Sequence, residues 1–234
     1  MHRMLSCAAR SMRAMNKHRR SRKAIITTLG LRPSVKEEFG VFRKALFVDA
    51  LGWSLKLQGD IEIDEFDTEN AVYCLIQESD KIISGFRAVI TTLPYLVKTH
   101  FSYLGSTRPF PSRDDYYEIS RFGVLPTENR LDIGLMTYAL MFDFAQRRDA
   151  TALVAIADLG HERLLRAMGI RTRRYGPPGV VGVDAWGRPI VSVAGDIPIA
   201  EQSQELIRLL SNLCETELEI TDETHVLGRA SVYA

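Results

Sequence analysis

The sequence has few of the residues from which disulfide frameworks, metal sites and membrane spans are built. Only three cysteines occur among its 234 residues, at positions 7, 74 and 214. Their odd number and wide spacing exclude a disulfide framework and a zinc site, and are typical of a reducing compartment. The five histidines are scattered as well, so we expect no bound metal. No apolar run approaches the ~18 residues that a membrane span needs.

Several motifs of common enzyme classes are also absent. The sequence contains no Gly-x-Ser-x-Gly, no Gly-Lys-Ser/Thr phosphate loop, no His-Glu-x-x-His and no Gly-x-Gly-x-x-Gly. These absences argue against a serine hydrolase, a P-loop nucleotide-binding protein, a zinc peptidase and a Rossmann dinucleotide site. The composition is otherwise that of an ordinary globular chain, with 46% hydrophobic and 25% charged residues. It is sufficient for one full core.

Acidic residues are missing from the first 30 positions, which carry eight basic residues, whereas the remainder has 22 basic and 29 acidic residues. Since the folded part is not basic, a chain-wide nucleic-acid binder is disfavoured. We interpret residues 1–30 as a disordered basic tail and residues 31–234 as a single domain. An organellar transit peptide, or an arm that contacts nucleic acid or membrane, stays open for the tail.

The hydrophobic pattern predicts interleaved strands and helices. A Ser34–Glu37 capping box precedes apolar residues at helical spacing, so we expect a helix from there to Gly52. Further helices are expected at 131–148, 161–168 and 200–213, with a short one inside 91–104. Strands are expected at 71–77, 82–90, 116–125, 151–157, 180–183 and 190–193. This order, with its antiparallel hairpins, predicts an α/β fold with one mixed sheet covered by helices on both faces.

The expected strand at 116–125 carries a dense polar cluster. Strict alternation would place Glu118, Ser120 and Phe122 on one face and Arg121 on the other. A carboxylate on a core strand needs a partner, because a buried unpaired charge is costly. Two interpretations are open: a structural salt bridge to Arg87 or Arg121, or a general base beside an oriented hydroxyl.

Other charged residues have two interpretations each. Asp64 and Asp67 lie in an acidic loop and either are solvated or hold a cation. Arg43 follows Phe42 on the expected first helix. Its side chain either extends along apolar surface or binds a carboxylate through its planar fork.

Taken together, these residues match the pattern of a known family. The patterns, in chain order, are Arg43-x-x-x-Phe47-x-x-x-x-Gly52-Trp53, Glu62-x-Asp64-x-Phe66-Asp67, Gly85-x-Arg87 and Glu118-x-Ser120-Arg121-Phe122. The combination resembles the acyl-homoserine-lactone synthase (LuxI-type autoinducer synthase) family of bacteria, most strongly over residues 39–124. The resemblance implies a single-domain α/β/α sandwich with a mixed sheet, similar to the N-acetyltransferase (GNAT) fold.

The resemblance also implies a reaction that makes a quorum-sensing signal. S-adenosylmethionine is a substrate, with no permanently bound cofactor, and the acyl chain comes from acyl carrier protein or from acyl-CoA. The substrate amine is acylated, and the methionyl carboxylate then attacks its own γ-carbon, closing the lactone and expelling methylthioadenosine. Because only a neutral amine attacks a thioester, a base is required, and we assign this role to Glu118.

The remaining site residues follow from the same resemblance. Ser120 is expected to stabilise the oxyanion, and Arg121 completes the catalytic group. The sulfonium and ammonium require carboxylates and aromatic faces, and the methionyl carboxylate requires an arginine fork. The residues assigned to S-adenosylmethionine binding are Arg43, Phe47, Trp53, Asp64, Asp67, Arg87 and Phe122.

The acyl chain and its donor are assigned to the C-terminal half. An acyl pocket is expected between the long helix and the strand after it, lined by Tyr138, Met141, Ala155, Leu164 and Leu165, although a ligand-free core of the same residues is an open alternative. Family members making 3-oxo products tend to have threonine where Ala155 aligns, so alanine favours an unsubstituted or otherwise modified chain.

Five arginines lie between positions 163 and 174: Arg163, Arg166, Arg171, Arg173 and Arg174. They are expected to steer docking of the acidic acyl carrier protein, the alternative being a solvated helix face. We expect a bacterial cytoplasmic enzyme that binds no nucleic acid and has no membrane span, and leave its oligomeric state open.

Two other functions remain alternatives. One is a GNAT-type N-acyltransferase acting on another amine. Such enzymes grip pyrophosphate with a glycine-rich turn at a helix start, and residues 129–134 lack that spacing. The other is a non-catalytic nucleic-acid-binding regulator that uses the basic tail.

Overall fold

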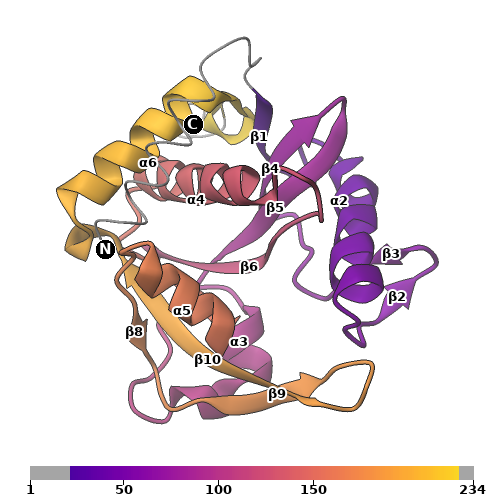
Figure 1. Cartoon of the computed structure of the whole chain (residues 1–234), viewed down its shortest axis with the longest axis vertical. Helices are drawn as coiled ribbons and strands as arrows, with labels where there is room; N and C mark the ends of the chain where they lie inside the picture. The colour runs from indigo at the N-terminus through magenta and orange to yellow at the C-terminus, as the bar shows by residue number, and fades with distance from the viewer. Residues whose placement is uncertain (1–21, 227–234) are drawn as a thin grey trace, which may run out of the picture.

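The computed structural model describes residues 22–226 (Figure 1). Its strands are β1 (Arg22–Thr28), β2 (Leu57–Gln58), β3 (Ile61–Glu62), β4 (Val72–Glu78), β5 (Lys81–Ile90), β6 (Tyr116–Val124), β7 (Ala152–Asp158), β8 (Arg173–Arg174), β9 (Gly179–Val183), β10 (Pro189–Pro198) and β11 (Leu218–Asp222). Nine of them form one sheet, in the order β11-β1-β4-β5-β6-β7-β10-β8, with β9 paired to β10. β1 with β11 and β6 with β7 are parallel pairs, and the remaining pairs are antiparallel.

Helices cover both faces of this sheet. The helical segments are α2 (Val35–Arg43), η1 (Lys44–Ala50), α3 (Leu96–His100), η2 (Ser102–Gly105), α4 (Arg130–Arg147), α5 (Leu159–Ala167), η3 (Ile199–Glu201), α6 (Gln204–Glu217) and η4 (Glu223–Val226). α2, η1 and α3 bury Phe39, Leu46 and Val97 in one core cluster. α4 and α6 lie side by side and bury Met136 and Leu210 in another (Figure 1). The predicted mixed sheet with helices on both faces is confirmed.

The N-terminal boundary predicted for the domain is wrong. Residues 22–28, assigned to the tail, form β1, which lies inside the sheet between β4 and β11. Ala24 and Ile26 are completely buried there. Their short apolar stretch suits a strand that is covered on both sides, although basic residues precede it. Residues 1–21, which hold the rest of the predicted tail, lie outside the described residues.

The first helix differs from its predicted form at its start and in its last turns. Ser34 already has helical angles, φ −62° and ψ −23°, and its side chain makes no capping hydrogen bond, so the predicted capping box is wrong. After Arg43 the helix continues as η1 with π-type spacing. π-helical segments are rare in proteins, and those that occur often lie at functional sites. Gly52, with φ +68°, ends the helix as predicted.

The sheet opens between its two central parallel strands. β6 and β7 pair only over Tyr116–Ile119 and Ala152–Ala155. Residues 121–123 of β6 and 156–157 of β7, beyond this register, are partly exposed, as is Ala155 at its end. The opening therefore begins directly after Ile119, beside Ser120.

α4 is the longest helix of the described part of the chain, with 18 residues. Its inner surface is almost wholly buried, as the nearly all-round apolar sequence predicts. No helix within residues 22–226 is long and apolar enough to cross a membrane.

Candidate active site

A β-bulge on β6 shapes the site. Arg121 has φ 55°, a left-handed conformation that is uncommon for a non-glycine residue. The register with β5 shifts at this point, so that Arg87 pairs with Ser120 whereas Gly85 pairs with Gly123. β6 thus contains one extra residue relative to β5. Such bulges are common next to active sites.

The bulge reverses the faces that strict alternation predicts. Arg121 lies on the same side as Ser120 and contacts Glu62. Phe122 lies on the other side of the sheet, where its ring stacks on Phe86 with centroids 6.1 Å apart. The predicted placement of Arg121 and Phe122 is therefore wrong, because a period of two does not survive an inserted residue.

Three arginines and three carboxylates meet on the α2 side of β6. We call Arg43, Arg87, Arg121, Glu62, Asp64 and Asp67 the ion-pair cluster. Arg43 is 1% exposed and donates to Glu62, Asp64 and Asp67, with 2.7 Å between its Nη1 and Asp67 Oδ2. The α2 helix thereby ends directly on the acidic loop.

The other two arginines bind the same carboxylates from the sheet. Arg87 is fully buried and donates from Nη2 to Asp64 Oδ2 at 3.0 Å and from Nη1 to Asp67 Oδ1 at 2.8 Å. Arg121 forms two hydrogen bonds to Glu62, at 2.9 and 3.0 Å. The arrangement is a closed network of equal and opposite charges, which is how buried charge becomes tolerable.

The arginine charges keep the three carboxylates of the cluster ionised. Burial opposes ionisation of Asp67, but the charges of Arg87 and Arg43 outweigh it and lower its pKa to about 2. Burial likewise opposes ionisation of Asp64 and Glu62, and their arginine hydrogen bonds lower both pKa values. Of the two interpretations left open for Asp64 and Asp67, the solvated loop is therefore wrong, because both carboxylates are buried and paired with arginines.

Glu118 has a different environment. It is 1% exposed, and its two carboxylate oxygens accept hydrogen bonds from the amides of Leu96 (3.0 Å) and Val97 (2.7 Å), at the start of α3. Burial raises its pKa to about 7, although both amide bonds act to lower it. No arginine bonds to this carboxylate among the described residues, so of the two interpretations left open for Glu118 the salt bridge to Arg87 or Arg121 is wrong. A carboxylate with such a pKa is poised to exchange protons near neutrality.

Ser120, two positions after Glu118 on β6, bonds to the ion-pair cluster. Its hydroxyl oxygen accepts a hydrogen bond from Arg87 Nε at 3.2 Å. That bond uses a lone pair and leaves the hydroxyl proton available to another acceptor. Arg87 thereby orients the serine while it holds two aspartates.

An aromatic wall borders the cluster. The Phe47 and Trp53 rings stack with centroids 5.1 Å apart, and the Trp53 amide donates to the Phe47 carbonyl at 2.8 Å. Trp53 also bridges to Asp184 at the tip of the β9–β10 hairpin. The wall packs against β6, since a Cβ at Gly123 would lie 3.6 Å from Phe47 Cζ and would overlap the side chain of the neighbouring Leu46.

The predicted acyl-pocket residues are only partly brought together. Tyr138, Met141 and Leu165 are buried in the core cluster between the sheet and α4, and Ala155 lies partly exposed at the opening of the sheet. Leu164 is 45% exposed, because it lies on the outer side of α5. The structure therefore does not bring Leu164 to the other four.

The five predicted docking arginines fall into two groups. Arg174 pairs with Glu162 at 2.6 Å, and Arg173 pairs with Asp196 at 3.0 Å. The side chains of Arg163, Arg166 and Arg171 are exposed. Arg163, Arg166 and Arg171 are therefore the part of the predicted patch that takes no part in the ion pairs with Glu162 and Asp196.

Two site residues were missed by sequence reasoning. Glu62 receives two arginines, and Tyr73 donates from its hydroxyl to Asp67 Oδ1 at 3.0 Å. Glu62 stood in one of the family patterns, so a signal for it existed. Tyr73 lies in an apolar strand, β4, and gives no such signal.

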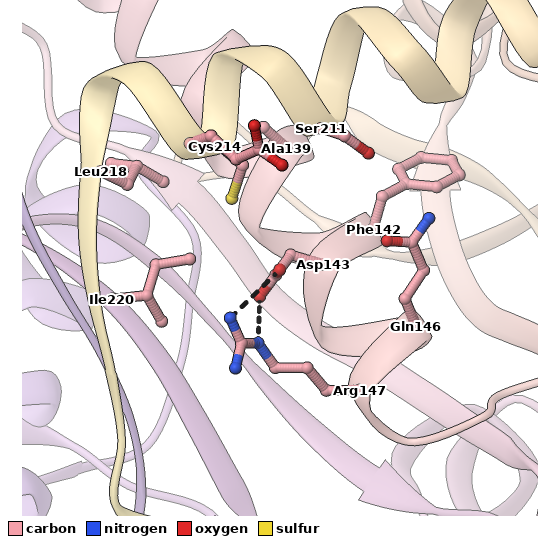
Figure 2. Close-up of a pocket in the computed structure, with 10 residues that line it drawn as sticks. Ala139, Phe142, Asp143, Gln146, Arg147, Ser211, Cys214, Leu218 and Ile220 are labelled. Atoms are coloured by element: carbon pink, nitrogen blue, oxygen red, sulfur yellow. Dashed lines mark hydrogen bonds and ion pairs between the residues drawn. The ribbon is translucent and has the colours of Figure 1, made fainter.

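A cavity elsewhere on the molecule does not belong to this site. It lies between α4 and α6, where Asp143 and Arg147 form an ion pair beside Cys214 and Leu218 (Figure 2). None of the predicted site residues lines it.

Comparison with known proteins gives the family. A family model described as "Autoinducer synthase" matches residues 28–205. The chain belongs to the autoinducer synthase family. An acyl-homoserine-lactone synthase of Acinetobacter nosocomialis is 34% identical over 153 residues, which cover 60% of this chain and 82% of that relative. One of Ralstonia solanacearum is 33% identical over 165 residues, covering 67% of this chain and 79% of the relative.

Solved structures agree with the family and with the fold. TofI, in a ternary complex with an inhibitor and MTA, is 27% identical, with a TM-score of 0.67, and the match covers 82% of this chain and 100% of TofI. A CoA-dependent acyl-homoserine lactone synthase, BjaI, solved with SAM and isopentyl-CoA, has a TM-score of 0.75 at 20% identity, covering 90% of this chain and 99% of BjaI. The predicted family and α/β fold class are confirmed, and the autoinducer synthase is an acyltransferase.

Proposed function

We propose that this autoinducer synthase transfers an acyl chain from a thioester donor to the amine of S-adenosylmethionine, and that it then closes the lactone with release of methylthioadenosine. The observation that carries this proposal is Glu118, a buried carboxylate with a pKa of about 7, two positions before Ser120 on β6. The patterns that place it there are those of the family.

Glu118 is the proposed general base. An α-amine has a pKa of ~7.7–8, so it is largely protonated at neutral pH and must lose a proton before it attacks. A carboxylate with a pKa of about 7 takes this proton at little cost, directly or through one water. An ordinary exposed glutamate, whose pKa is about 3.5 units below that of the amine, would be a weaker base.

Ser120 is the proposed stabiliser of the tetrahedral oxyanion. Its hydroxyl is oriented by Arg87 and keeps its proton for an acceptor. A preorganised donor at the developing oxyanion typically contributes a factor of ~10²–10³ in rate. The collapsing intermediate then expels the thiolate of the donor.

Binding of S-adenosylmethionine is assigned to the exposed edge of the ion-pair cluster and to the aromatic wall. Asp64 and Arg121 have the more exposed side chains of the cluster, at 12% and 10%. We assign the methionyl carboxylate to Arg121, and the positive charge to Asp64 and the face of Trp53. Arg43 and Arg87 hold the carboxylates in place, because they are buried and fully engaged.

The acyl chain is assigned to the opening between β6 and β7. Phe122 faces this side rather than the ion-pair cluster, so we transfer it from the nucleotide site, where the sequence placed it, to the acyl path. Tyr138, Met141, Ala155 and Leu165 lie on the same side of the sheet. Chain and nucleotide would thus approach Glu118 from opposite faces.

We further propose that the donor is acyl carrier protein, docked on Arg163, Arg166 and Arg171, with acyl-CoA as the alternative. These exposed cations lie on α5 and just after it, near the opening. Acidic partners are steered to such patches by long-range attraction. The bacterial cytoplasm is the proposed location, consistent with the free, buried Cys74 and Cys214.

The test is a reaction of the purified protein with S-adenosylmethionine and either donor. We expect equal amounts of methylthioadenosine and acyl-homoserine lactone, measured by mass spectrometry. Glu118→Gln should abolish both products while leaving the fold and nucleotide binding nearly intact. Full turnover by that variant would remove Glu118 from the base role, and an acylated product without lactone would favour a plain N-acyltransferase.

A further inference from the structure

A hydrogen-bonded pair of side chains lies on the α4 side of the opening. The hydroxyl of Tyr138, on α4, is 2.7 Å from Nε2 of His161, on α5. Tyr138 is 4% exposed.

Phe122 closes the pair into a group of three rings, which we call the ring cluster (Phe122, Tyr138 and His161). Its ring centroid is 4.8 Å from that of Tyr138 and 5.8 Å from that of His161. Phe122 takes this position because of the bulge at Arg121, which turns it to the α4 side. The catalytic strand therefore contributes directly to the ring cluster.

The ring cluster spans the opening of the sheet. Phe122 belongs to β6, and His161 lies in the first turn of α5, directly after β7. His161 is fixed there because Asp158 caps the helix and accepts from the His161 amide at 2.9 Å. An acyl chain whose carbonyl lies beside Ser120, and which runs through the opening to the α4 side, therefore meets these rings.

We infer that the ring cluster is the end wall of the acyl pocket and that the Tyr138–His161 pair sets the longest straight acyl chain this enzyme accepts. The inference rests on the proposed function and deepens it. A purely apolar wall would yield to a longer chain by changing rotamers. Displacing this pair leaves a buried hydroxyl and a ring nitrogen unpaired, which is far less favourable.

The charge state of the wall suits an acyl chain. Burial lowers the pKa of His161, with Asp158 acting in the opposite direction, so the imidazole is neutral at neutral pH. A neutral pair that satisfies its own hydrogen bond presents ring faces to the chain. The pocket thus accepts alkyl chains up to the wall and rejects those that extend past it.

The experiment is a competition assay. The enzyme receives S-adenosylmethionine and an equimolar mixture of straight-chain acyl donors of four to fourteen carbons, and lactone lengths are measured by mass spectrometry. His161→Ala opens space behind Phe122, so the preferred length should increase by two or more carbons. Each newly buried CH₂ is expected to favour the longer donor about fourfold. Tyr138→Phe keeps the ring but loses the bond, and should broaden the range of lengths.

A variant of opposite sign and a matched control complete the design. Ala155→Val narrows the opening and should shift the products to shorter chains, which keeps the test valid if His161→Ala does not fold. Leu131→Ala, at an 83% exposed position of α4, should leave the distribution unchanged. If both His161→Ala and Ala155→Val make lactones with the same chain lengths as the unmodified enzyme, this inference is wrong and the proposed function stands. Absence of lactone from every donor in the unmodified enzyme would overturn the proposed function, and this inference with it.

Discussion

Replacing Glu118 by glutamine should change the pH dependence of stability as well as activity. The pKa of Glu118 is about 7 in the fold, against an ordinary value of 4.5. A carboxyl whose folded pKa is raised stabilises the fold below its unfolded pKa, and this contribution is lost as the pH rises through the folded pKa. The shift of about 2.5 units corresponds to about 3 kcal/mol in full.

The part of this effect between about pH 5.5 and about pH 8 amounts to roughly 2 kcal/mol of unfolding free energy. Glutamine does not ionise. As the pH rises through this interval, the free energy of unfolding of Glu118→Gln should therefore fall by about 2 kcal/mol less than that of the unmodified protein. The lost amide hydrogen bond shifts the stability of the variant by about 1 kcal/mol, but equally at both pH values.

The assay is urea denaturation of both proteins at each pH, with the unfolding free energy extrapolated to water. Glu128→Gln, at an exposed position, is the matched control and should follow the unmodified protein. If Glu118→Gln and the unmodified protein show the same pH dependence, Glu118 titrates normally. A Glu118 that titrates normally would contradict the argument for its role as the general base.

Three further outcomes follow from the packing and the charges. Gly123→Ala should destabilise the fold by about 1–3 kcal/mol in urea denaturation, since its Cβ would overlap Leu46; an unchanged midpoint would show that η1 can move away. Arg43→Met should cost about 3–5 kcal/mol, because buried carboxylates lose their cation, and a loss under 1 kcal/mol would contradict the ion-pair cluster. Reversing charge at Arg163 and Arg166 should raise KM for acyl carrier protein donors at low salt and not for acyl-CoA; equal KM values would exclude docking there.

Sequence reasoning predicted the elements whose signals are local. The long buried α4 and the hairpin of β4 and β5 lie within a few residues of their expected bounds, because their periodicity is set by neighbours along the chain. Physical reasoning singled out Glu118, Arg43 and the acidic loop, but it left two interpretations of each, and the family patterns chose between them. The salt bridge that remained open for Glu118 is the interpretation that the structure does not support.

The features that were missed depend on partners distant in sequence. β1 is a strand because it lies between β4 and β11, and its own short apolar stretch does not reveal that. The bulge at Arg121 depends on the register with β5, so alternation along β6 could not show which way Phe122 points. Glu62 acquires its role only where Arg43 and Arg121 converge.

The parallel pairing of β1 with β11 has a consequence for biosynthesis. Arg22 lies opposite Leu218 in the register, so one of the earliest strands to leave the ribosome receives its last neighbour only when nearly the whole chain has been made. Until then, β1 presents an unpaired edge to solvent and to other nascent chains. Completion of the sheet is therefore a late event, and shortening the C-terminus before β11 would leave an aggregation-prone edge on an otherwise assembled catalytic half.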